Sequence, residues 1–209
     1  MSIACHPRFL SDRPPGNPFA TRFTRPGAIP PLDRQGRPLD LAALTTRLRA
    51  LGAAAIVGPH GHGKTTLLVA LADGLAGDGL PVVVLRARTW RDCFLAIRVI
   101  AAAPAGGLVC IDGWETLGPY RGPLRQAARW LGRGLLVTSH GTAGLPVLCE
   151  CGTSATLLHA IVARLPDQGG RIDAEMVATA FERHGGDLRE SLSELYDRYE
   201  RAAADPPVR

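Results

Sequence analysis

The sequence contains a single lysine, and this scarcity is informative. Of the 24 basic residues in the 209-residue chain, Lys64 is the one lysine and all the others are arginine. Arginine can replace lysine where a surface needs only charge, but its guanidinium is a planar fork, whereas lysine carries one compact charge on a thin stem. We therefore expect Lys64 to occupy a narrow site, such as one around a phosphate.

Long apolar runs are also missing. No stretch reaches the roughly 18 uninterrupted apolar residues that a membrane-spanning helix needs, because Arg98 and Pro104 break the longest candidate, residues 95–111. Residues 1–15 lack the apolar run of roughly 7 to 15 residues that is typical of a secretory signal. We therefore predict a cytoplasmic protein with no membrane contact.

Cysteines are few and odd in number, at positions 5, 93, 110, 149 and 151. A disulfide framework needs pairs, and the two ligands of a zinc pair normally have two to four residues between them. Cys149 and Cys151 are closer than that, and no second pair exists. The sequence therefore predicts reduced thiols rather than a disulfide scaffold or a zinc centre.

Lys64 lies in a glycine-rich segment that satisfies the pattern G-x-x-x-x-G-K-[ST], the Walker A motif. The segment reads Gly58-Pro59-His60-Gly61-His62-Gly63-Lys64-Thr65-Thr66. An apolar run of strand type, residues 53–57, precedes it, and residues 67–72 continue it as a helix that Gly74 and the turn at residues 77–79 are expected to end. A strand, a glycine-rich turn and a helix are the context in which this motif binds phosphate.

The chemistry of the motif predicts a site for ATP and Mg²⁺. Backbone N–H groups of residues 58–66 and the positive end of the helix dipole would face the phosphates. The Lys64 ammonium would reach the β- and γ-phosphates, and the Thr65 hydroxyl would ligate Mg²⁺, which prefers hard oxygen donors. His60 and His62 flank the loop; they either touch phosphate oxygens or, as we favour, point to solvent.

An acidic residue follows a second apolar run. Asp112 ends the run at residues 108–111, 48 positions after Lys64, and we assign it to the metal as the Walker B residue. Glu115 follows three positions later, either as the base that polarises water or as a solvated helix start. Ser139 and Thr138 end another apolar run and are slightly preferred over His140 as polar groups beside the γ-phosphate; the alternative is that these residues only cap the end of a strand.

Strand-like and helix-like segments alternate along the chain, which predicts an α/β fold. Strands are expected at residues 81–85, 108–112, 135–138 and 146–149, and helices at residues 90–103 and 123–131. Such alternation implies a mostly parallel sheet that is covered on both faces and binds ligands at the carboxyl ends of its strands.

With these motifs the chain resembles the P-loop NTPase division that includes AAA+ and STAND ATPases. Further helices are expected at residues 154–165, 173–184 and 187–201, and the resemblance implies that they form a helical lid. It also implies a contact of Arg189, in the sequence Gly186-Asp187-Leu188-Arg189, with the γ-phosphate; the alternative is that Arg189 is one more exposed arginine of the helix. The expected organisation is a basic arm at residues 1–40, a nucleotide-binding domain at 41–152 and a lid with its tail at 153–209.

Two departures from the AAA+ pattern point to slow or switch-like hydrolysis. Gly113 stands where AAA+ proteins usually carry a second acid, and residues 141–145 leave no room for the helix that bears their arginine finger. A metabolite kinase remains an alternative, with Arg121, Arg125 and Arg129 over the phosphates, as does a nucleotide-gated binding module with little turnover. A guanine-specific GTPase is excluded, because its Asn-Lys-x-Asp motif needs a second lysine.

The excess positive charge of the chain is confined to its start. Residues 1–50 hold eight arginines and three aspartates, whereas basic and acidic residues balance beyond them. The stretch at residues 14–38 is rich in Pro, Gly and Arg, and it is expected to be an extended arm rather than a helix, anchored by Phe19, Phe23 and Ile29. The arm could pack beside adenine, bind nucleic acid or, as we favour, lie along the core; a protein partner is possible but unidentified.

Overall fold

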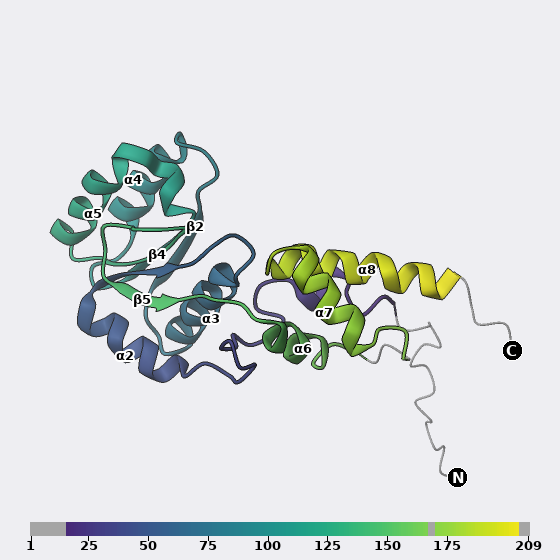
Figure 1. Ribbon diagram of the computed structural model, residues 1–209. Coiled ribbons are helices and arrows are strands. Elements are labelled where there is room, and N and C mark those ends of the chain that lie inside the picture. Colours follow the sequence, from purple (N-terminus) through teal and green to yellow (C-terminus); the bar gives the residue numbers. More distant parts are fainter. Residues whose placement is uncertain (1–15, 167–169, 205–209) are drawn as a thin grey trace, which may run out of the picture.

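The computed structural model describes residues 16–166 and 170–204, and it comprises an α/β unit followed by a helical unit (Figure 1). Cys5, the first fifteen residues of the basic arm and the tail at 205–209 lie outside the described residues. Cys93, Cys110, Cys149 and Cys151 are free thiols. No helix in the described part is long and apolar enough to cross a bilayer.

A five-stranded parallel sheet forms the centre of the α/β unit, in the order β2-β3-β4-β1-β5. The strands are β1 (Ala53–Val57), β2 (Val82–Arg86), β3 (Leu108–Asp112), β4 (Gly134–Ser139) and β5 (Val147–Glu150). All five lie within one or two residues of their expected positions. The prediction of a parallel α/β sheet is therefore confirmed.

Helices cover both faces of the sheet (Figure 1). One layer consists of α2 (Leu41–Leu51) and α3 (Lys64–Gly77), and the other of α4 (Asp92–Ala102), the 3₁₀ segment η1 (Trp114–Tyr120) and α5 (Arg121–Trp130). Successive strand residues point to opposite faces, so Ala54 and Ile56 pack in the α3 layer and Ala55 in the α4 layer. The apolar runs of the sequence are thus buried on both sides.

Some helix boundaries differ from the expected ones, and the helix α2 was not expected. Of the two expected stops of α3, the turn at residues 77–79 ends the helix and Gly74 does not, because Leu71 and Leu75 pack against the sheet and outweigh the roughly 1 kcal/mol cost of a helical glycine. The helix expected from residue 90 begins at Asp92, because residues 88–91 form a turn held by that carboxylate. The missed helix, α2, is capped by the Asp40 side chain, which accepts from a backbone N–H of its first turn.

The helical unit contains α6 (Ala155–Val162), α7 (Ala174–Arg183) and α8 (Leu188–Ala204). Ser154 and Asp173 cap the first two, and α6 ends three residues before its expected end. The arm packs on this unit: Phe19 is buried against Tyr199, with ring centroids 6.3 Å apart. The expectation that the arm contains no helix is wrong for the four residues of α1 (Thr21–Thr24).

Candidate nucleotide-binding site

Polar residues from different strands meet at the carboxyl edge of the sheet. Because all the strands are parallel, their last residues lie side by side: Arg86 of β2 pairs with Asp112 of β3, and Ser139 of β4 pairs with Val57 of β1. The glycine-rich loop follows Val57 directly. The topology therefore brings the glycine-rich loop and the acidic residue Asp112 to the same edge of the sheet.

Three glycines shape the loop between β1 and α3. Gly61 and Gly63 have φ of +71° and +80°, a region that residues with a side chain rarely adopt. Gly58 lies against the backbone of Cys151, whose carbonyl oxygen would be 2.5 Å from an added Cβ. Gly63 is the N-cap of α3, so the unpaired backbone N–H groups at the start of that helix face the concave side of the loop.

The Lys64 side chain turns back into this loop. Its ammonium donates hydrogen bonds to the carbonyl oxygens of Gly58 at 2.7 Å and Pro59 at 2.6 Å, and the residue is only 8% exposed. Burial lowers the pKa of Lys64, and nearby negative charge, chiefly that of Glu115, opposes that shift only in part. The ammonium thus lies within the space that the loop encloses.

Thr65 and Asp112 are in direct contact. The Thr65 hydroxyl donates to the Asp112 carboxylate, at 3.0 Å from Oδ1 and 3.2 Å from Oδ2. The Thr138 hydroxyl donates to Oδ1 at 2.7 Å, and Nε of Arg86 donates to Oδ2 at 3.2 Å. Three residues from three elements thus fix the orientation of this carboxylate.

The contact between Thr65 and Asp112 has the chemistry of a magnesium site. A hydroxyl and a carboxylate are hard oxygen donors, and Mg²⁺ usually takes one or two protein ligands together with waters and phosphate oxygens. Within residues 16–166 and 170–204, no group of three or more His, Cys, Asp or Glu side chains could hold a metal. The donors present therefore fit a magnesium ion that is shared with a phosphate.

Glu115 lies at the start of η1, next to His140. One carboxylate oxygen of Glu115 is 3.4 Å from Nε2 of His140, and the other is buried and accepts no hydrogen bond from the described residues. The His140 ring in turn meets His60 of the loop edge to face, with centroids 5.7 Å apart. A buried carboxylate oxygen without a donor is costly, and a hydrogen bond from a bound water or ligand would offset this cost.

The other polar residues expected beside the γ-phosphate lie in different settings. Thr138 is buried and bonded to Asp112, and Ser139 is buried at the end of β4. His62 is half-buried with Nδ1 3.4 Å from the Cys151 carbonyl oxygen, and burial lowers the pKa of His62. Thr66 lies in the first turn of α3.

The start of α8 approaches the glycine-rich loop. The Asp187 carboxylate accepts from the backbone N–H groups of Arg189 and Glu190 and so caps this helix. An added Cβ on Gly61 would be only 1.9 Å from Asp187 Oδ1, so the carboxylate lies directly against the loop. Arg189 itself is exposed, and its contact with a γ-phosphate stays a prediction.

The arginines of the kinase alternative do not gather around the loop. Arg121 and Arg125 donate to the carbonyl oxygens of Gly118 and Gly144, in the layer of α5. Arg129 lies exposed near the end of the same helix.

Sequence reasoning missed Arg86 and Asp187. Arg86 follows an apolar strand in the same way that Asp112 does, and this repeated position was the signal that could have found it. Asp187 caps α8, and no local pattern indicates that this cap lies against a loop more than 120 residues earlier in the sequence.

Comparisons with known proteins give a fold and no family. No protein-family model matches the sequence, and no curated protein matches it. Among solved structures, a DNA replication initiation factor superposes with a TM-score of 0.54 and 14% identity, over 78% of this chain and 63% of that one. C. elegans PCH-2 gives a TM-score of 0.40 and 12% identity, over 79% and 67%.

The chain thus spans less than two thirds of the initiation factor. At this identity the likeness is one of fold. The strand order, the loop that joins β1 to α3 and the C-terminal helices agree with it. The chain has the P-loop NTPase fold that the sequence predicts, and its strand order, which the sequence did not predict, is that of AAA+ ATPases.

Proposed function

We propose that this protein binds ATP with Mg²⁺ and hydrolyses it slowly, using the nucleotide as a conformational switch. The observation that carries the proposal is the contact of Thr65 with Asp112, beside an ammonium that is buried inside the glycine-rich loop. These three groups come from two separate sequence motifs. They supply the charge and the hard oxygen donors that a metal-bound triphosphate requires.

Each residue then has a defined task. Backbone N–H groups of the loop and the Lys64 ammonium hold the β- and γ-phosphates, and Thr65 and Asp112 hold the metal. Bound Mg²⁺ would neutralise charge on the phosphate oxygens. Thr138 and Arg86 act on Asp112, because their hydrogen bonds fix the direction of its carboxylate.

Glu115 is the leading candidate for the base. One oxygen of its carboxylate has no hydrogen bond from the described residues and would accept a proton from the attacking water once water reaches it, and His140 contacts the other oxygen. Slow turnover is expected because Gly113 takes the position directly after Asp112, so Glu115 must act from the separate 3₁₀ segment.

Switch-like use follows from the place of Asp187. A triphosphate in the loop would bring several negative charges close to this carboxylate, which lies against Gly61 and caps α8. Repulsion between like charges would favour a shift of α8 away from the loop. Nucleotide binding would thereby be transmitted to the helical unit, where a protein partner could detect it.

Calorimetric titration of the protein with ATP in the presence of Mg²⁺ tests binding, and phosphate release without an added acceptor tests hydrolysis. We expect binding in the micromolar range or tighter and turnover well below about 1 s⁻¹. The absence of binding heat with ATP and with every other purine triphosphate would reject the proposal. Phosphate transfer to an added metabolite, without release to water, would favour the kinase.

A further inference from the structure

A hollow lined by arginines lies on the helical unit, between α7 and α8. Its volume is about 350 Å³, and charged residues provide most of its lining. These residues are Arg171, Arg183, Arg198, Arg201 and Glu194. None of them was assigned to the nucleotide site, so the hollow needs a separate explanation.

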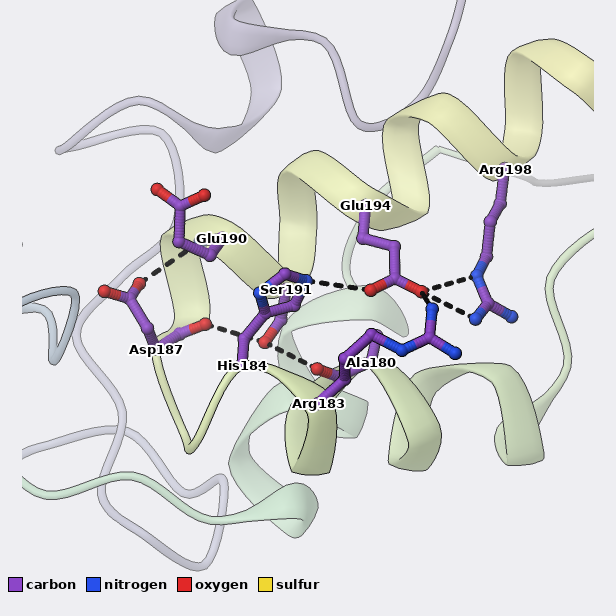
Figure 2. Close-up of polar contacts among 8 residues, drawn as sticks. All are labelled: Ala180, Arg183, His184, Asp187, Glu190, Ser191, Glu194 and Arg198. Atoms are coloured by element: carbon purple, nitrogen blue, oxygen red, sulfur yellow. Dashed lines mark hydrogen bonds and ion pairs between the residues drawn. The ribbon is translucent and has the colours of Figure 1, made fainter.

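The single carboxylate of this lining is shared among several cations (Figure 2). One oxygen of Glu194 accepts from Arg183 at 2.7 Å and from Arg198 at 2.8 and 2.6 Å, and the other lies 2.8 Å from Nε2 of His184. The Glu194 side chain is only 12% exposed. One negative charge therefore orients two guanidinium groups and cannot neutralise both.

The other two arginines of the lining have neutral hydrogen-bond acceptors in the described chain. Arg171 donates to the Tyr199 hydroxyl, and Nε of Arg201 donates to the backbone carbonyl of Asp197. The further carboxylates of the two helices lie outside the lining: Glu175, Glu182, Glu190, Asp197 and Glu200. The hollow thus has an excess of positive charge among its lining residues, and many guanidinium N–H donors beyond those bonded to residues that the structure describes.

These arginines are distributed along the helix pair. Arg171 lies three residues before α7 and Arg183 is the last residue of α7, a helix of 10 residues that is about 15 Å long at 1.5 Å per residue. Arg198 and Arg201 lie on the facing side of α8, which runs beside α7 (Figure 1). A row of this length suits an extended chain of anions better than one compact phosphate.

We propose that this hollow binds the phosphate backbone of a single nucleic-acid strand, without reading its bases. Guanidinium groups bind phosphate oxygens in bidentate geometry. The phosphates of a nucleic acid are part of its backbone, so they bind without the ordering of a side chain. The carboxylates of an acidic peptide lie at the ends of side chains, which lose rotamer freedom on binding. The lining contains no exposed aromatic side chain on which a base could stack, so contact is limited to the backbone.

The test measures the fluorescence anisotropy of labelled dT12 and rU12 with the nucleotide-free protein at several salt concentrations. Each phosphate contact in a single strand contributes a slope of about 0.7 to the plot of log affinity against log salt. The double variant Arg183→Gln with Arg201→Gln removes two contacts, so we expect its slope to be shallower by about 1.4 and its affinity to fall at least about tenfold. Similar losses with DNA and RNA are expected, because only the backbone is bound.

The matched control is Arg98→Gln with Arg129→Gln, which removes the same charge from exposed positions on the α/β unit. It should bind dT12 as the wild type does. ATP binding and the unfolding temperature show whether each variant is folded. If the double variant does not fold, Arg201→Gln alone is used for the binding measurement. Several outcomes would overturn the proposal: no binding by the wild type, unchanged binding by the double variant, equal losses in the control, or tighter binding to poly-glutamate than to dT12.

Discussion

The hydroxyl of Thr65 lies 3.0 Å from a carboxylate oxygen of Asp112, although 47 residues separate them in the sequence. In the nucleotide site proposed here, both oxygens face one magnesium ion. Asp112→Asn removes the charge of the carboxylate but keeps an oxygen that can accept from Thr138. We expect at least about a tenfold loss in apparent magnesium affinity, with ATP binding in EDTA nearly unchanged.

Calorimetric titrations of the Asp112→Asn variant with ATP, in Mg²⁺ and in EDTA, make this measurement. Asp78→Asn is the control, because Asp78 is an exposed carboxylate whose partner is Arg49. Equal losses with and without Mg²⁺ would show that Asp112 does not act through the metal.

Lys64→Ala should raise the dissociation constant for ATP at least about 100-fold, because two hydrogen bonds between an ammonium and phosphate oxygens are lost. Lys64→Arg keeps the charge, but a guanidinium is too wide for a loop in which the ammonium lies 2.7 Å and 2.6 Å from two carbonyl oxygens. We expect this variant to lose most of its affinity as well. ATP binding by the arginine variant at the wild-type level would contradict the explanation of the single lysine.

Glu115→Gln should leave ATP affinity within about threefold of wild type and lower the rate of phosphate release at least about 100-fold, the contribution of a general base. Glutamine can still contact His140, whereas its amide does not accept a proton from water. Single-turnover measurement of phosphate release separates this step from product release. Turnover at the wild-type rate would remove Glu115 as the base and direct attention to Ser139 or His140.

The α/β architecture was predictable from the sequence because its signals are local. The runs before Lys64 and at residues 108–112 are apolar on both faces, as buried parallel strands require, and the glycine pattern of the loop specifies its turn. Contacts between distant segments were not predictable. Phe19 was expected as an anchor, but nothing in the arm indicates that it packs on Tyr199 rather than beside the nucleotide.

The site shows the same division. Thr65 and Asp112 were expected from motifs, and they do meet. Arg86 reaches Asp112 because β2 and β3 are neighbours in the sheet, and strand order cannot be read from an alternating pattern alone. The cluster around Glu194 forms because α7 packs on α8. This packing determines which charged side chains of the two helices come into contact, and the sequence of either helix alone does not indicate it.

Glu194→Gln should destabilise the fold more at neutral pH than in acid. Burial alone would raise the pKa of Glu194, but hydrogen bonds from Arg198 and His184 and the charge of Arg183 outweigh it and hold the pKa below its usual range. A carboxyl group with a lowered pKa stabilises the folded state above its unfolded pKa of about 4.3, and the contribution disappears as the pH falls through the folded-state value.

Urea unfolding of wild type and Glu194→Gln at pH 7 and pH 3 tests this dependence. We expect a difference in unfolding free energy of about 1 kcal/mol at pH 7 and a smaller difference at pH 3. Glu182→Gln, at an exposed position on α7, should show no such dependence. A difference of the same size at both pH values would mean that Glu194 acts through packing rather than charge.

The contact between Gly61 and Asp187 predicts a coupling between the glycine-rich loop and α8. Gly61→Ala introduces strain from its φ of +71° and a clash with the Asp187 carboxylate. In an Asp187→Ala background the clash is absent and only the strain, about 1–2 kcal/mol, remains. The destabilisation caused by Gly61→Ala should therefore be smaller in that background, even though the loss of the helix cap itself costs about 1 kcal/mol.

Gly63→Ala is the matched control for this cycle, because Gly63 has a φ of +80° but no atom within 4 Å of an added Cβ. Its cost should not depend on residue 187. The free energies of unfolding of the single and double variants give both couplings.

Titration with ATP shows whether release of α8 from the loop also raises the affinity for ATP. Because Asp187 would repel the phosphates, we expect Asp187→Ala to bind ATP more tightly than the wild type. Additive effects of Gly61→Ala and Asp187→Ala, together with unchanged ATP affinity, would remove the physical link on which the proposed switch depends.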